Sequence, residues 1–353
     1  MTDASSTAQR PGGDRAPLRV LFFCGEQSPW GRAHLRPLLE DPRVELAGVV
    51  LASETRWAVF REKLTGEPAR ASGALGRARQ YVGRKLGRRE DHAGDVRRLL
   101  VERDVPLIFS HSVNAKADRR RFRDTGADIF FSAAYPQIFG RLLLGLPPRG
   151  AYNSHPSLLP RCRGAHPVFW AIASGERRSG GTIHLMTTEL DRGGIAAQQE
   201  VPLGDDDYHA DLYARLVRAV PGLLRRFVDW LLLPGAELVP QDDDRATFFT
   251  NDRREDHRID WAGMDAARIN RLVRACDGNA FFSVGGEEIL VRRISAPGPG
   301  QGEPGRVEAM DGGRPVVAAR EGLLTIEACE ARHGGEAVFE KGQTLLDEGE
   351  GPQ

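Results

Sequence analysis

Two short apolar runs separated by an amphipathic segment constrain the fold of this chain most strongly. Residues 18–24 form an apolar run that ends at Gly25, as expected of a strand buried on both faces. Residues 30–40 carry apolar side chains at helical spacing, and residues 44–51 form a second apolar run. Strand, helix and strand in this order begin a doubly wound sheet. We therefore expect an α/β fold built on a Rossmann-like, mostly parallel sheet.

The first turn of this unit carries one glycine, Gly25, in place of a Gly-x-Gly-x-x-Gly motif. A nicotinamide cofactor is therefore not indicated, because the phosphate-binding turn of that class uses several glycines. Further apolar runs at 105–109 and 128–134 alternate with helical patterns at 95–102 and 114–124. These runs extend the same sheet.

The last third of the chain has a different pattern. A helical pattern at 266–276 is followed by five short strand-like runs, which predict a second, smaller β-barrel of the OB-like kind. Before it, residues 210–233 predict one or two amphipathic helices with a break at Pro221 and Gly222. The predicted organisation is a disordered lead-in at 1–17, an α/β domain at 18–205 with an insert at 56–98, a helical and extended linker at 206–258, the barrel at 259–330 and a loose tail at 331–353.

Composition excludes several classes of protein. The chain has 49 Lys and Arg against 49 Asp and Glu, so no overall field attracts it to nucleic acid or to an anionic membrane. The four cysteines are far apart and form no Cys-x-x-Cys pair, which favours a reducing compartment without structural zinc. Because we find neither a signal peptide nor a long apolar span, we expect a cytoplasmic protein with no membrane partner.

The insert at 56–98 is strongly basic, with twelve Lys or Arg and five acidic residues. Apolar residues at helical spacing run through its second half. One interpretation is a solvated amphipathic insert with no direct functional role. The other is an electropositive cap that draws in a phosphate-bearing substrate.

The motif with the clearest chemistry begins at the end of a predicted strand. Asn153 and His155 point the same way, because side chains alternate along an extended segment. Parallel sheets place their ligands at the carboxyl ends of their strands. Pro156 and Pro160 then stiffen the loop that follows. The pattern predicts one amide and one imidazole that face a common ligand.

A second motif supplies a carboxylate. Residues 182–186 alternate as a strand does, and Asp191 follows in a glycine-rich loop. If the two loops converge, the amide, the imidazole and the carboxylate can stabilise an oxyanion and move a proton, as acyl transfer requires. Both motifs are, on spacing alone, also compatible with ordinary structural turns. His155, His166, His184 and Asp191 lack the spacing of a metal site, so we expect no metal.

The run NSHPSLLPRCRGAHPVFWAIASGE, followed by GGTIHLMTTELDRGGI, resembles the folate-dependent formyltransferase family. That family includes glycinamide ribonucleotide transformylase, methionyl-tRNA formyltransferase and the sugar N-formyltransferases. The resemblance consists of an Asn-x-His, a Ser-Leu-Leu-Pro loop, an Arg-Gly-x-x-Pro and a Leu-Asp-x-Gly in this order. It extends over about residues 18–330 and is densest between 128 and 203.

The resemblance implies transfer of a formyl group from 10-formyltetrahydrofolate to a primary amine or hydroxylamine. Asn153 would donate to the oxyanion, and His155 would stabilise it as an imidazolium. Asp191 would favour that imidazolium and help remove the proton from the attacking nitrogen. The folate would lie against three short segments of the chain. These segments comprise Gln137, Ile138 and Phe139, then Ser157, Leu158 and Leu159, and then Thr187, Thr188 and Glu189.

One of these folate segments has a second interpretation. The turn at 135–139 could instead pack under the next helix, and this explains Ile138 and Phe139 equally well.

The acceptor follows less directly from the resemblance. Methionyl-tRNA formyltransferases carry a basic Arg-Pro-Ala-Gly-Arg-Gly loop after the second strand, where this chain has residues 51–57. We therefore expect a small-molecule amine, such as an amino sugar nucleotide, and regard tRNA as the less favoured acceptor. Two further functions are compatible with these motifs: a formyl-folate hydrolase and a catalytically inactive folate- or RNA-binding module. The oligomeric state is left open.

Overall fold

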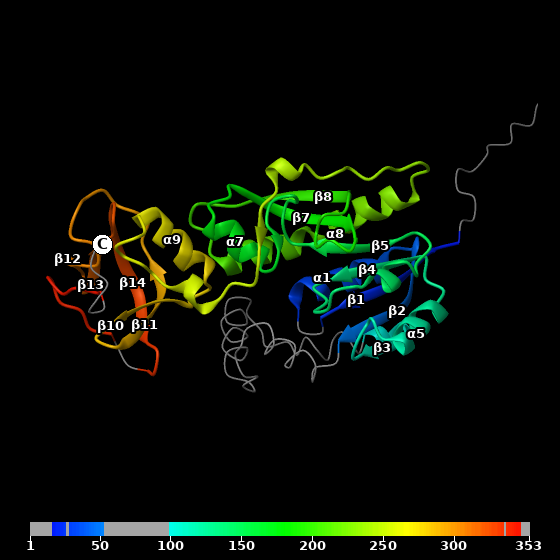
Figure 1. Cartoon of the computed structure of the whole chain (residues 1–353), viewed down its shortest axis with the longest axis horizontal. Coiled ribbons are helices and arrows are strands. Elements are labelled where there is room, and N and C mark those ends of the chain that lie inside the picture. Colours follow the sequence, from blue (N-terminus) through cyan, green and yellow to red (C-terminus); the bar gives the residue numbers. More distant parts are fainter. Residues whose placement is uncertain (1–15, 26–27, 53–98, 335–336, 347–353) are drawn as a thin grey trace, which may run out of the picture.

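A computed structural model describes residues 16–25, 28–52, 99–334 and 337–346 of the chain. The predicted lead-in up to residue 15 and the basic insert at 56–98 lie outside the described residues. Two β-sheets lie at opposite ends of an elongated molecule (Figure 1). Over the described ranges, the helices are too short or too polar to cross a membrane.

The first sheet has seven strands in the order β3-β2-β1-β4-β5-β7-β8. Neighbours from β3 to β5 are parallel, whereas β7 and β8 join antiparallel at one edge. This confirms the Rossmann-like, mostly parallel sheet predicted from the apolar runs. The strands are β1 (Leu18–Cys24), β2 (Val44–Ala52), β3 (Leu107–Ser110), β4 (Ile129–Ala133), β5 (Ala151–His155), β7 (Arg178–Leu185) and β8 (Ile195–Pro202).

Side-chain alternation along β1 explains why both faces of this sheet are covered. Phe22 belongs to one apolar cluster and Phe23 to another on the opposite face. Helices α1 (Pro29–Glu40) and α8 (His209–Leu232) cover the face of Phe22, and α5 (Lys116–Asp124) and α6 (Arg141–Leu144) cover the other. A strand in this position must therefore be apolar on both sides, as the sequence of β1 is.

Helix α8 corrects one prediction, because it runs without a break through Pro221. Proline in a helix interior removes one hydrogen bond and costs about 3 kcal/mol. The buried stripe continues on both sides of it, through Val220, Leu224 and Phe227. Each buried side chain of this size contributes about 1.5–3 kcal/mol. Burial of the stripe therefore outweighs the local penalty and keeps the helix whole.

The second sheet is antiparallel, with its five strands in the order β10-β11-β14-β13-β12. It forms the smaller β unit that the sequence predicts. Helix α9 (Ala266–Ala275) begins at the Asp265 cap and packs against α7 (Pro167–Ala173) of the first unit. The strands are β10 (Ala280–Val284), β11 (Glu287–Ile294), β12 (Val307–Asp311), β13 (Arg314–Ala318) and β14 (Leu323–Ala331).

The predicted loose tail is corrected for residues 337–346. Phe339 and Leu345 are buried in the apolar core of this part of the chain. The backbone of Leu345 also donates to the carbonyl of Gly305 at 2.7 Å. The Gly- and Glu-rich composition of the tail concealed these two apolar anchors.

The segment 238–250, which we call the strap, runs back along the first sheet from the end of α8 toward α9 (Figure 1). It contains the 3₁₀ helix η1 (Asp243–Arg245) and the short strand β9 (Phe248–Phe249). Strand β9 pairs in parallel with β6 (Arg163–Gly164), and Val239 bridges to Ile195 at the start of β8. The 3₁₀ helix η2 (Arg254–His257) follows the strap. The strap thus holds both the loop after β5 and the start of β8.

Candidate active site

Asn153 and His155 occupy the carboxyl end of β5, and their side chains share one face of the sheet. Antiparallel pairing with β7 sets Asn153 opposite His184 and His155 opposite Thr182. The Nδ2 atom of Asn153 lies 3.5 Å from Nε2 of His184. The register of two neighbouring strands therefore creates a cluster of an amide and two imidazoles.

Asp191 reaches this cluster from the turn after β7. Its φ of 55° is in the left-handed region, and its side chain is 5% exposed. One carboxylate oxygen lies 3.6 Å from Nδ1 of His155 and accepts from the backbone N–H of Gly164 at 2.9 Å. The other lies 3.4 Å from Nε2 of His184. The structure thus brings together all three residues predicted to carry the chemistry.

The environment keeps Asp191 ionised. Burial alone would raise the pKa of this carboxyl group. The charge of His155, the hydrogen bond and charge of His184 and the N–H of Gly164 oppose burial and lower the pKa to about 2. The Asp191 carboxylate therefore remains charged at neutral pH although it is buried.

His155 has protein partners at both ring nitrogens. Its Nε2 donates to the carbonyl of Cys162 at 2.8 Å, and its Nδ1 faces Asp191. A carbonyl can only accept, so this contact places a proton on Nε2. The two partners fix the orientation of the ring at the carboxyl end of β5.

His184 is the site residue that the sequence did not single out. The sequence offers it only as a possible metal ligand, although the alternation of residues 182–186 gives it the same face as Thr182. Its Nδ1 lies 3.0 Å from the carbonyl of Leu185, and its Nε2 faces both Asn153 and Asp191. Only the register between β5 and β7 reveals that it lies opposite Asn153.

The other face of β5 is braced by α1. The Trp30 indole donates to the carbonyl of Ser154 at 2.9 Å. His34 is fully buried, and this burial lowers its pKa to about 4 even though a hydrogen bond to Trp30 opposes the shift. The neutral ring donates from Nδ1 to the Trp30 carbonyl and accepts from the Ser154 hydroxyl, at 2.7 and 2.8 Å. These bonds fix the strand that carries Asn153 and His155.

The first predicted folate segment follows β4, and its side chains point in different directions. Ile138 is exposed, whereas Phe139 is buried in the apolar core against Phe23. The Gln137 side chain accepts from the backbone N–H of Val113 at 3.0 Å. Ile138 therefore faces outward, while Phe139 and Gln137 fasten the turn. Their contact with a folate stays a prediction.

The second segment, in the loop after β5, is packed inward against β7. Thr182 donates to the carbonyl of Ser157 at 2.7 Å and accepts from the N–H of Leu159 at 3.1 Å. Ser157 and Leu159 are buried, and Leu158 packs against Gly180. The loop is consequently rigid, but these side chains are directed toward the protein.

The third segment lies in the open. Thr187, Thr188 and Glu189 are exposed on the turn that precedes Asp191. Thr187 and Glu189 hydrogen-bond to each other through the Thr187 hydroxyl. This turn can therefore contact a ligand at the rim of the site. Its role stays a prediction.

His166, which the sequence also offers as a possible metal ligand, pairs with a different carboxylate, that of Asp252. His257 contacts the other oxygen of Asp252 at 2.6 Å. Within the described ranges, no group of three or more His, Cys, Asp or Glu side chains is arranged to hold a metal ion. All four cysteines lie within those ranges, and none forms a disulfide.

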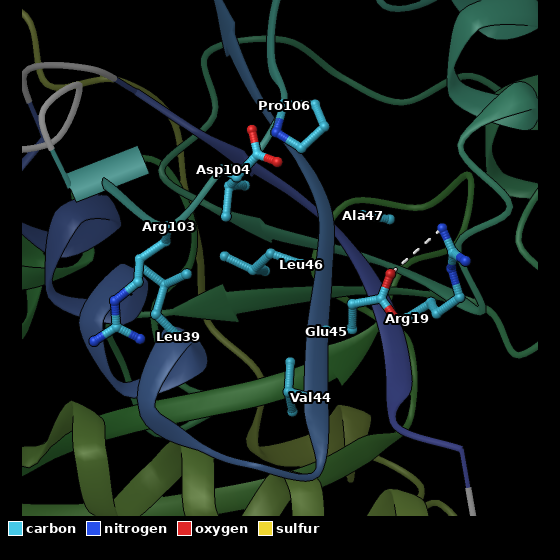
Figure 2. Close-up of a pocket in the computed structure, with 10 residues that line it drawn as sticks. Arg19, Leu39, Val44, Glu45, Leu46, Ala47, Arg103, Asp104 and Pro106 are labelled. Atoms are coloured by element: carbon cyan, nitrogen blue, oxygen red, sulfur yellow. Dashed lines mark ion pairs between the residues drawn. The ribbon is translucent and has the colours of Figure 1, made fainter. Parts of the chain in front are cut away.

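A cavity of about 430 Å³ lies at the opposite ends of the strands of the first sheet from Asn153 and His155 (Figure 2). It opens at the amino ends of β1 and β2, where Arg19 and Glu45 form an ion pair of 3.6 Å. Ligands of doubly wound sheets bind at the carboxyl ends of the strands. We therefore place the candidate active site at the carboxyl end of β5 and not in this cavity. Its lining also includes Leu39, Val44, Leu46, Ala47, Arg103, Asp104, Val105 and Pro106.

Two family models match the chain. The formyl transferase model matches residues 63–227, and the model for the formyl transferase C-terminal domain matches residues 253–338. The methionyl-tRNA formyltransferase of Thermotoga sp. (strain RQ2) is 32% identical over 63% of this chain and 72% of its own length. The corresponding protein of Thermotoga maritima is 34% identical over 61% of this chain and 69% of its own length.

Solved structures share the fold at lower identity. A sugar N-formyltransferase from a Shewanella species has a TM-score of 0.55 and 19% identity, covering 78% of this chain and 97% of its own. An N-formyltransferase from Helicobacter canadensis has a TM-score of 0.57 and 15% identity, covering 87% and 98%. HypX from Aquifex aeolicus has a TM-score of 0.52 and 19% identity, covering 90% of this chain but 46% of that longer one.

The fold and the His-Asp-Asn cluster at a strand end are those of an α/β enzyme suited to acyl transfer. The matches of both family models and the two relatives above 30% identity narrow this class of enzyme to one family. The chain belongs to the formyl transferase family and is a formyltransferase.

Proposed function

We propose that this protein is an N-formyltransferase that uses 10-formyltetrahydrofolate as donor and the amine or hydroxylamine of a small molecule as acceptor. An amino sugar nucleotide or another phosphate-bearing amine would be such an acceptor. The observation that carries the proposal is the convergence of Asn153, His155 and Asp191 at the end of β5. This trio supplies a donor to an oxyanion, a positive imidazole and a proton-accepting carboxylate.

The reaction makes one bond and breaks one. The acceptor nitrogen bonds to the formyl carbon, whose oxygen becomes negative in a tetrahedral intermediate. The bond from that carbon to N10 of the folate then breaks. The proton lost by the acceptor nitrogen ends on N10, so the products are a formamide and tetrahydrofolate.

Each of the three residues would have a separate task. Asn153 would donate from Nδ2 to the negative oxygen, which lowers such a barrier by about 3 kcal/mol. His155, charged between Asp191 and the Cys162 carbonyl, would add a positive field at the same place. Asp191 would hold that charge and accept the proton of the attacking nitrogen.

The donor assignment rests on the family and on two solved relatives. HypX was crystallised with tetrahydrofolic acid, and the Helicobacter canadensis enzyme with folinic acid and dTDP-3-aminofucose. In this chain the exposed groups around the site are Ile138 and the turn from Thr187 to Glu189. We propose that they line the folate side, together with the backbone of Gln137, Phe139 and the 157–159 loop.

The choice of acceptor has two candidates. The departure of residues 51–57 from a basic Arg-Pro-Ala-Gly-Arg-Gly loop favours a small molecule over tRNA. Methionyl-tRNA is the second candidate, because three relatives of 31–34% identity are methionyl-tRNA formyltransferases. Cytoplasmic location stays an expectation from the sequence.

A parallel acceptor assay tests the proposal. The full chain is incubated with 10-formyltetrahydrofolate and, separately, amino sugar nucleotides, hydroxylated amines, methionyl-tRNA and buffer alone. We expect tetrahydrofolate release that depends on a small amine, with the mass of that amine raised by one CO. Release with methionyl-tRNA alone would replace the first candidate by the second. Release in buffer at the same rate would indicate a hydrolase, and release in no tube an inactive binding module.

A further inference from the structure

The side chain of Gln241 in the strap reaches into the turn that carries Asp191. Its Nε2 donates to the carbonyls of Asp191 and Gly193, at 2.8 and 2.7 Å. Its Oε1 accepts from Nε and Nη2 of Arg163, at 3.0 and 2.8 Å. An amide side chain has two N–H groups and two lone pairs. All four hydrogen-bonding positions of Gln241 are therefore used.

Arg163 fixes which way this amide points. A guanidinium can only donate, so the amide oxygen must face Arg163 and the NH₂ group must face the two carbonyls. The Arg163 side chain is 5% exposed, and its remaining Nη1 pairs with Asp243 of the strap at 2.8 Å. A buried arginine that loses its acceptor becomes costly, which holds Gln241 in place.

The turn at Asp191 needs such support. A non-glycine residue in the left-handed region is strained, so other local conformations compete with the observed one. The Gln241 amide binds both carbonyls of this turn, while the N–H of Gly164, next to Arg163, binds the carboxylate itself. Arg163 and Gln241 thus connect the two loops whose relative position sets the distance from Asp191 to His155.

We propose that Gln241, oriented by Arg163, is a positioning residue for formyl transfer. It fixes the 191–193 turn so that the Asp191 carboxylate stays against His155 and His184. The inference rests on the proposed function, because it assigns Asp191 a part in the reaction. It also means that the strap completes the active site, although residues 228–252 lie between the segments that match the two family models.

The test substitutes Gln241→Glu in the full chain. The new carboxylate still accepts from Arg163 but repels the carbonyls of Asp191 and Gly193. We expect kcat for the accepted amine to fall about tenfold or more, since misplacing a reacting group by about 1 Å costs up to about a hundredfold. The KM for 10-formyltetrahydrofolate should stay within about twofold, because the strap amide contacts the turn and not the predicted folate segments. Gln241→Met removes the donors without adding charge and should lower kcat in the same way.

The matched control is Asn270→Asp in the second unit. Asn270 is a buried amide that, like Gln241, accepts from an arginine, Arg274, and donates to a carbonyl, that of Ser295, each at 2.8 Å. Its substitution imposes the same chemical change away from the site, so we expect kcat within about twofold of wild type. Equal losses in Asn270→Asp and Gln241→Glu would mean that general destabilisation, and not positioning, explains the effect.

A fourth variant separates this inference from the proposed function. If Asp191→Asn is inactive while Gln241→Glu and Gln241→Met both keep the wild-type kcat, the positioning role is wrong and the proposed function survives. If Asp191→Asn is itself as active as wild type, the assigned chemistry fails first. A rise in donor KM that parallels the loss of kcat would also overturn the positioning role, because the folate side would then be disturbed.

Discussion

Two aspartates of this protein each contact two histidines, yet their settings differ. Asp191 lies 3.6 Å from His155 and 3.4 Å from His184, at the carboxyl end of the first sheet. Asp252 lies 2.6 Å from His257 and also pairs with His166, on the connection that leads to the second unit. Judged by distance alone, Asp252 makes the tighter histidine contact.

The surroundings of the two aspartates, in contrast, favour Asp191 as the residue of the candidate active site. The Asp191 side chain is 5% exposed, has the Asn153 amide across the same cluster and receives the N–H of Gly164. His166, in contrast, keeps 58% of its side chain exposed. Burial lowers the pKa of His257, which reduces its charge at neutral pH. The Asp191 cluster therefore differs from the Asp252 cluster in its amide donor and in the burial of both its histidines, and a short contact does not mark it.

The largest losses of turnover should follow from truncating the side chains that surround Asp191. We expect Asn153→Ala and His155→Ala each to lower turnover by at least about a hundredfold, because each removes a group that stabilises the oxyanion. His257→Ala should stay within about threefold, since that ring lies in the other cluster. Steady-state formyl transfer with the amine found in the acceptor assay measures all three. A residue whose variant keeps the wild-type rate would have no part in the chemistry.

A backbone change in the Asp191 turn should have the next largest effect. A Cβ atom on Gly193 would lie 1.8 Å from the carbonyl oxygen of Leu185, so Gly193→Ala must displace the turn. We expect about a tenfold loss of turnover. Gly145→Ala is the control, because its Cβ would meet Arg141 at an ordinary 3.6 Å. Equal activity in the two variants would show that the turn tolerates movement.

The stability of the protein should fall in acid partly through Asp191. The pKa of this group is about 2 in the folded protein and lies below its ordinary value of 3.8. Its stabilisation is therefore complete above about pH 4 and is lost as the pH falls toward 2, a change of about 2 kcal/mol. Urea unfolding at several pH values should show a smaller acid loss in Asp191→Asn than in wild type. Parallel pH dependence in the two proteins would contradict the low pKa.

The smallest effect should come from the exposed histidine of the Asp252 cluster. We expect His166→Gln to change turnover by less than about twofold and the free energy of unfolding by no more than about 1 kcal/mol, since exposed ion pairs contribute little. Thermal and urea unfolding with the formyl-transfer assay would check both. A large loss of turnover would mean that this cluster also acts on the reaction.

Local patterns predicted much of this architecture. The apolar runs that become β1 and β2 located the first sheet, and strand alternation put Asn153 and His155 on one face. Asp191 followed from its place after a strand. These features depend on residues within a few positions of one another, where periodicity is informative.

Contacts set by long-range register could not be predicted in this way. His184 lies against Asn153 because β5 and β7 are antiparallel in one register. Gln241 meets Arg163 across 78 positions of sequence. Pro221 in α8 and Phe139 in the core show the same limit, because burial over a whole face outweighed the local signal of a break or an open turn.

The role of the Asp191 carboxylate is tested by comparing Asp191→Asn with Asp252→Asn in one formyl-transfer assay. Both substitutions remove the charge from a carboxylate between two histidines. We predict that Asp191→Asn loses at least about a hundredfold in turnover while Asp252→Asn stays within about threefold of wild type. Comparable turnover in the two variants would contradict the assignment of the chemistry to the cluster at the end of β5.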